Sequence, residues 1–92
     1  MASFYHVFIQ PKTGIIDSQV EEKMNLSLDW FRCTPSVWVL YSTSEIEKWQ
    51  NRLRPLVERG GSLFICKLNI NVRNGWMSKD FWEWIRKNES RP

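Results

Sequence analysis

The segment from Asp29 to Thr43 constrains the fold of this 92-residue chain more than any other stretch. Residues 36–41 read Ser-Val-Trp-Val-Leu-Tyr, a run of β-branched, aromatic and aliphatic side chains typical of a buried interior strand. The residues before it mix Trp30 and Phe31 with charged side chains and end at a Thr-Pro pair, and proline is mostly confined to sheet edges and turns. The segment therefore predicts two strands that meet at a Thr-Pro turn, the first at a sheet edge and the second inside the sheet.

The rest of the chain supplies two more strands and three helices. Each strand is a short apolar run, and each helix starts at a side chain that can accept a hydrogen bond from the first turn. We expect strands at residues 3–10 and 62–69, and helices that start at Asp17 or Ser18, at Ser44, and at Ser78. Glu47, three residues after Ser44, completes a capping box. Pro55 would break an interior turn, so the second helix should kink or pause at Arg54 and end by the Gly-Gly pair that follows.

The order of these elements predicts the fold. Strand, helix, strand, strand, helix, strand is the ferredoxin-like βαββαβ plan, here with one added C-terminal helix at about residues 78–88. Right-handed crossovers then give an α+β domain with a four-stranded antiparallel sheet of order 4-1-3-2 and the two crossover helices on one face. A chain of this length is expected to form one domain, residues 1–92. Three strands are apolar on both sides, so the Trp-rich tail helix or a partner subunit should cover the other face.

Charge and composition exclude several classes of protein. The 13 basic and 10 acidic side chains are interspersed, and a net charge of +3 permits nucleic acid without arguing for it. No apolar run is long enough to span a membrane, and the first residues lack the pattern of a signal peptide, so we expect a cytoplasmic protein without a membrane partner. Cys33, Cys66 and the single histidine, His6, are too few for a metal site, and we expect two buried, reduced thiols and no cofactor.

The hairpin segment also resembles a known family. Cys33-Thr-Pro-Ser-Val-Trp38, followed by a strand, a Ser-capped helix, a fourth strand and the pair Trp84-Ile85, is similar to the SinR-like small bacterial proteins, relatives of the CRISPR-associated endoribonuclease-like adaptation subunit. The resemblance covers roughly residues 4–87 and implies the ferredoxin-like fold and a dimer-forming sheet. In the nuclease-like relatives an aspartate ends the first strand and holds a metal. Here Gln10 stands in that place, and a neutral amide lacks the charge that a hard divalent cation needs, so metal-dependent cleavage is not expected.

Aromatic residues late in the chain are the main candidates for binding. Phe81, Trp84 and Ile85 have the spacing of a core-facing helix, so we expect them in the core. Trp76 and Trp82 are the better candidates for a contact surface, because aromatic residues dominate the energy of many interfaces.

Two further sets of residues are candidates. Arg52 and Arg86 could contact phosphates, although interleaved glutamates favour a solvated surface of mixed charge. Trp30 and Phe31 lie on the expected edge strand, which a protein normally covers or pairs, and they predict a homodimer interface that includes the sheet edge.

The sequence thus favours a non-catalytic, dimerising module that binds another protein or a nucleic acid through its sheet edge and aromatic tail. Two alternatives stay open: a small metal-dependent endoribonuclease of the CRISPR-adaptation type, and a phage-encoded inhibitor of a host complex. Gln10 argues against the first, and no residue separates a host regulator from a phage inhibitor. No catalytic residue is assigned, because the sequence has one histidine, interpreted as structural, and no Gly-x-Ser-x-Gly motif.

Overall fold

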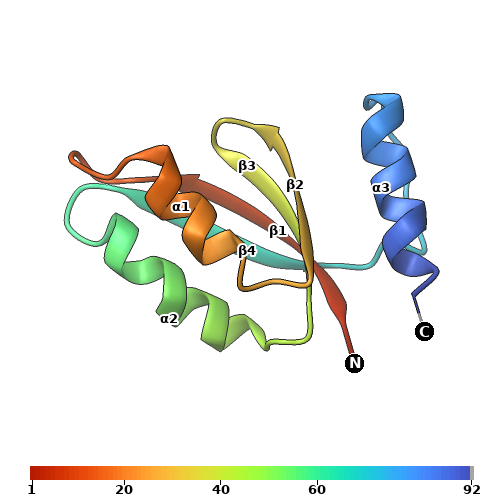
Figure 1. Ribbon diagram of the computed structural model, residues 1–92, viewed down its shortest axis with the longest axis horizontal. Helices are drawn as coiled ribbons and strands as arrows, with labels where there is room; N and C mark the ends of the chain where they lie inside the picture. Colours follow the sequence, from red (N-terminus) through yellow and green to blue (C-terminus); the bar gives the residue numbers. More distant parts are fainter. Residues whose placement is uncertain (92) are drawn as a thin grey trace.

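Seven elements follow one another along the chain in the computed structural model, which describes residues 1–91 (Figure 1). They are β1 (Ser3–Gln10), α1 (Asp17–Met24), β2 (Asp29–Thr34), β3 (Val37–Ser42), α2 (Ile46–Val57), β4 (Ser62–Leu68) and α3 (Lys79–Glu89). Every strand and helix expected from the sequence is present. The α+β class and the four-stranded antiparallel sheet are therefore confirmed.

The sheet places β1 and β3 inside and β2 and β4 at its edges. Its order is β2-β3-β1-β4, which reads 4-1-3-2 when it is followed from the β4 edge, and every neighbouring pair is antiparallel. The Thr-Pro turn joins β2 to β3, and the backbone N–H of Ile9 donates to the carbonyl of Ser36 at 2.8 Å, which ties the end of β1 to that turn. The hairpin segment thus forms one half of the sheet, as its sequence predicted.

Helices α1 and α2 cover one face of the sheet (Figure 1). Side chains alternate along β1, so that Tyr5, Val7 and Ile9 point into this layer and are almost fully buried. They form one cluster with residues of β3 and the two helices, namely Trp38, Leu40, Val20, Met24, Trp49, Leu53, Leu56 and Val57. Burial of a large apolar side chain contributes about 1.5–3 kcal/mol, so this cluster is the main source of stability.

The other face of the sheet is covered at one end by α3. Trp84 and Ile85 pack there on Phe4, Val39 and Tyr41, in a second apolar cluster. The expectation that the Trp-rich helix covers this face is therefore confirmed for one end of the strands. In Figure 1 α3 stands beside the sheet, away from α1 and α2.

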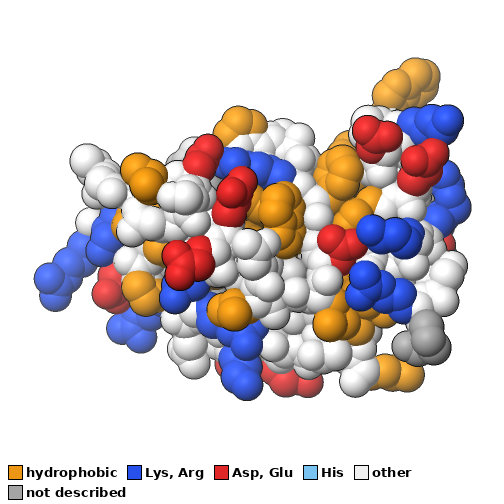
Figure 2. All heavy atoms as spheres, viewed as in Figure 1, with side chains coloured by type: hydrophobic (Ala, Val, Ile, Leu, Met, Phe, Trp, Pro, Cys, Tyr) orange, Lys and Arg blue, Asp and Glu red, His pale blue; other side chains and the backbone are white. Residues whose placement is uncertain are grey.

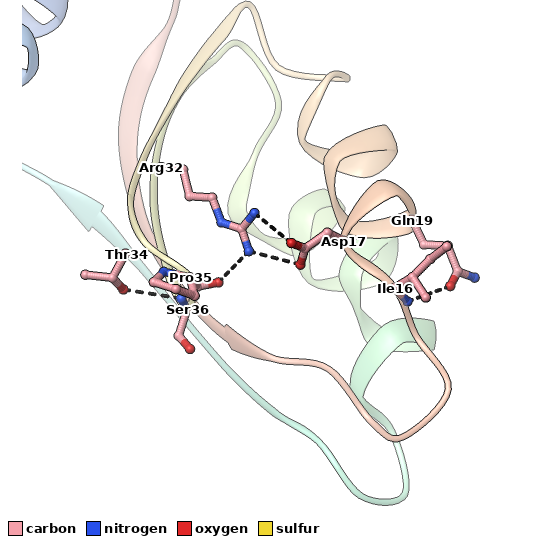
Figure 3. A network of polar contacts seen from close by, with 7 residues as sticks. All are labelled: Ile16, Asp17, Gln19, Arg32, Thr34, Pro35 and Ser36. Atoms are coloured by element: carbon pink, nitrogen blue, oxygen red, sulfur yellow. Dashed lines mark hydrogen bonds and ion pairs between the residues drawn. The ribbon is translucent and has the colours of Figure 1, made fainter.

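Two of the expected helix starts are wrong. Helix α1 begins after Ile16, whose backbone N–H donates to Oε1 of Gln19 at 2.9 Å, so neither Asp17 nor Ser18 is the cap (Figure 3). Helix α2 begins after Glu45, without a side-chain cap. Ser44 instead serves tertiary contacts, because its carbonyl accepts from the hydroxyl of Tyr5 at 2.9 Å.

The other helix signals have mixed outcomes. Ser78 caps α3 as expected, since its Oγ accepts from the backbone N–H of Phe81 at 3.2 Å. Helix α2 shows no break at Arg54; it runs through Pro55 to Val57 and so ends before the Gly60-Gly61 pair, as expected. Pro55 is exposed near the last turn, and so is Asn51, four residues before it, so the carbonyl that lacks a helical donor can bind water.

The cysteines lie on opposite edge strands, Cys33 on β2 and Cys66 on β4, and both are free thiols. Cys33 is half-buried, and Cys66 is exposed, so the expectation that both are buried is wrong. The reason is that Cys66 points to the uncovered part of the second face. Within residues 1–91 no helix has the length and apolar character needed to cross a membrane.

Candidate interaction surfaces

The two residues expected at a dimer interface pack inside the protomer, on opposite faces of the sheet. The Trp30 ring lies 4.7 Å from that of Trp38, and its Nε1 donates to Oδ1 of Asn25 at 2.8 Å. The Phe31 ring lies on the other face, 5.4 Å from the ring of Phe81. Edge strand β2 is thus covered by α1 on one side and by α3 on the other.

Polar contacts also lie along the β2 edge (Figure 3). The guanidinium of Arg32 donates to Oδ1 of Asp17 at 3.1 Å and to the carbonyl of Pro35 at 2.8 Å, and it lies over the Trp38 ring. The register with β3 shifts between Arg32 and Thr34. Charges, a turn proline and a register shift are features that discourage pairing with another strand.

The expected binding residues are spread over separate surfaces. Trp76 is fully exposed in the segment before α3, and Trp82 is half-buried, with its ring 5.3 Å from that of Phe81. Arg86 is exposed on α3. Arg52 lies on the opposite face of the sheet, where its guanidinium stacks on the buried ring of Trp49. Only Trp76, Trp82 and Arg86 therefore share one side of the molecule.

Around α3 the surface has mixed charge. Figure 2 shows acidic and basic side chains side by side along this helix. Lys79 forms an ion pair with Glu83 at 3.8 Å, and Arg73 forms a bidentate ion pair with the carboxylate of Glu89 at 2.8 and 2.9 Å. Trp82 lines a shallow apolar groove of about 310 Å³ next to this surface, together with Leu68, Ile70, Val72, Met77 and Ile85. The expectation of a solvated, mixed-charge surface fits these contacts better than a phosphate site does.

One polar cluster fastens α3 to the sheet. Asn88 is fully buried, and its Nδ2 donates to Oδ2 of Asp29 at 3.1 Å and to the carbonyl of Trp84 at 3.0 Å. The ammonium of Lys87 lies 3.1 Å from the same oxygen of Asp29. Burial acts to raise the pKa of Asp29, but hydrogen bonds, chiefly from Asn88 and Lys87, outweigh it and hold that pKa below its ordinary value.

The part of the second face that α3 leaves open carries three rings that the sequence did not single out together. The pairing of β3, β1 and β4 arranges side chains in rows across the strands. Helix α3 covers the row Tyr41, Phe4 and Leu68, and it also covers Val39 in the next row, which continues with His6 and Cys66. The last row is Val37, Phe8 and Phe64. Phe64 is 61% exposed. We call His6, Phe8, Phe64 and Cys66 the open patch.

Alternation along the strands was the signal that could have found this patch. Phe4, His6 and Phe8 share one face of β1, and Phe64 and Cys66 share the same face of β4. Apolar residues on both faces of β4 hid the distinction, because nothing in the sequence says how far the tail helix reaches over the sheet.

The outer edge of β4 is the second candidate surface. This strand has seven residues, no proline and an unshifted register with β1 from end to end. Within the described chain no strand pairs with its outer side. A groove of about 310 Å³ runs between this edge and α2, lined by Ile46, Glu47, Gln50, Leu63, Phe64 and Ile65. Such an unprotected edge is a template for another strand.

Gln10, the residue that argued against metal-dependent cleavage, is exposed. Gln10 ends β1 opposite Ser62 of β4. Among residues 1–91, no three His, Cys, Asp or Glu side chains come together as a metal site would need.

Neither the family models nor the curated proteins nor the solved structures compared with this chain include one that matches it.

Proposed function

We propose that this protein is a non-catalytic, cytoplasmic interaction module of ferredoxin-like type that forms a homodimer by pairing the β4 edges of two copies. The observation that carries the proposal is the contrast between the two sheet edges. At the β2 edge an Arg32–Asp17 pair and a register shift discourage pairing, whereas β4 offers seven residues in regular register with one charge, Lys67, beside a groove of mixed polarity. The likeness of the hairpin segment to SinR-like proteins agrees with a dimer-forming sheet and belongs to the same proposal.

Symmetry supports this arrangement. Two copies of one strand can pair antiparallel about a two-fold axis perpendicular to the sheet, which makes a self-complementary contact and removes both free edges. The sheet would continue from one copy to the other, with α1 and α2 of both copies on one side. Each new backbone hydrogen bond contributes about 0.5–1.5 kcal/mol.

Sedimentation velocity tests the proposal. Wild-type protein should sediment as a dimer at micromolar concentration. The double variant Ser62→Lys, Cys66→Lys places two charges on exposed positions of β4 and should sediment as a monomer, because the two-fold axis brings like charges together.

A matched variant controls for general effects of added charge. Thr34→Lys introduces a lysine at an exposed position of the opposite edge strand, and it should leave the dimer intact. A wild-type protein that stays monomeric as its concentration rises, or a dimer that the β4 variant leaves unchanged, would overturn the proposal.

A further inference from the structure

We propose that the open patch binds single-stranded nucleic acid by stacking bases on Phe8 and Phe64. These two residues are direct neighbours in the β1–β4 register, and both rings lie on the face of the sheet that α1 and α2 do not cover. Paired strands lie about 4.8 Å apart, and successive rows on one face lie about 7 Å apart. The patch therefore presents two adjacent rings, with the imidazole of His6 one row away.

The chemistry of the patch favours bases over an aliphatic partner. Phe64 is exposed by 61%, and Phe8 and His6 are half-buried, so the rings have accessible surface. Every nucleobase has an aromatic face, and exposed rings on an antiparallel sheet are a recurrent platform for unpaired bases. Stacking of this kind tolerates many sequences, and we expect little preference among bases.

The charges on this face are compatible with a polyanion. Strands β1, β3 and β4 contain no aspartate or glutamate. The acidic residue of β2, Asp29, lies at the covered end, where the ammonium of Lys87 neutralises its charge and the amide of Asn88 donates to it. Lys12 and Arg59 lie close to the Phe8 and Phe64 end, one after β1 and the other before β4. A phosphate backbone would meet these cations at the margin of the patch.

The position of α3 argues for a flexible strand over a second copy of the sheet as the occupant. This helix packs on the same face, on Phe4, Tyr41 and Val39, and Val39 is the direct neighbour of His6. A second flat sheet laid on the patch would meet α3 before it reached Phe8. A single strand of nucleic acid can lie beside the helix. Dimerisation through β4 leaves the face free, so the inference does not depend on the dimer.

Fluorescence anisotropy with labelled oligouridylate tests the proposal, with oligothymidylate and a duplex of equal length as further probes. Wild-type protein should bind both single strands and should bind the duplex more weakly. Phe64→Ala should weaken binding by about 5- to 100-fold. Phe8→Leu, which preserves apolar volume in a half-buried position, should weaken it in the same direction. Two phosphate contacts would give a slope of about −1.4 in a plot of log affinity against log salt.

Trp76→Leu is the matched control, because it removes a fully exposed ring that lies outside the patch. It should leave binding unchanged, and sedimentation of every variant should be recorded alongside anisotropy. Absence of binding by the wild type at low salt would overturn the proposal, as would binding that depends on Trp76 and not on Phe64. If the wild type binds no oligonucleotide and Phe8→Leu no longer forms the dimer, a second copy of the chain occupies the patch instead. If Ser62→Lys alone, a change at an exposed β4 position outside the open patch, gives a monomer that still binds, the two proposals succeed separately.

Discussion

The contact between Asp29 and Asn88 should couple β2 to α3, and a double-mutant cycle can measure that coupling. Asp29→Ala removes one of the two acceptors of the buried Asn88 amide, and the carbonyl of Trp84 remains as the other. A hydrogen bond to a charged group contributes about 1.5–3 kcal/mol. The carboxylate is 25% exposed, so solvent weakens the hydrogen bond. We therefore expect Asp29→Ala to reduce the free energy of unfolding by about 1.5 kcal/mol, at the low end of that range.

The assay is urea unfolding followed by tryptophan fluorescence, with thermal unfolding as a second readout. Asn88→Ala should cost about 2 kcal/mol, because it removes a fully buried hydrogen-bonded amide. The double variant should be less destabilised than the sum of the two, by about 0.5–1.5 kcal/mol. A loss of 1.5 kcal/mol in a chain of this size corresponds to a fall of about 6–12 °C in Tm.

Lys87→Ala serves as the control, because its side chain is 62% exposed and such ion pairs contribute little. It should change the free energy of unfolding by less than about 0.5 kcal/mol. A coupling between Asp29 and Asn88 of less than about 0.3 kcal/mol, the usual scatter of additive sites, would refute the reasoning.

Three further predictions concern titration, thiols and the exposed tryptophan. The folded pKa of Asp29 is below its ordinary value of 3.8, so its stabilisation is present above that pH and is lost as pH falls through the folded pKa. The urea midpoints of wild type and Asp29→Asn should therefore converge as the pH is lowered below 3.8. Cys66 should react with iodoacetamide faster than Cys33, because burial raises the pKa of the Cys33 thiol, and mass spectrometry of early time points that shows the reverse order would contradict the exposure of β4. Trp76→Ala should change stability by less than about 0.5 kcal/mol in thermal unfolding, since the side chain is fully exposed, and a larger loss would mean that it packs.

Local and periodic signals predicted the framework of the fold. The run before Tyr41 identified an interior strand, and the Thr-Pro turn marked its edge neighbour, because side-chain pattern and proline chemistry act over a few residues. Ser78 was recognised as a cap for the same reason. Ser44 was assigned wrongly because its hydroxyl accepts from the guanidinium of Arg52 at 3.0 Å instead of capping, and the helix begins one residue later.

The candidate surfaces could be predicted only in part, because they depend on how elements cover one another. Trp30 and Phe31 have the pattern of a bare edge, yet α1 and α3 cover them from opposite faces. Phe64 sits in an apolar run that looks buried throughout, and its exposure follows from where α3 ends on the sheet. The residue pattern of one strand does not indicate which other elements cover it.

Hydrogen exchange of the β4 backbone amides tests the central claim, that this edge pairs with a second copy, more directly than any other measurement. The account predicts that β4 amides directed away from β1 exchange more slowly as protein concentration rises through the dimerisation range, while the outer amides of β2 keep the same rate at every concentration. Outer β4 amides that exchange at one fast rate over that whole range would contradict it.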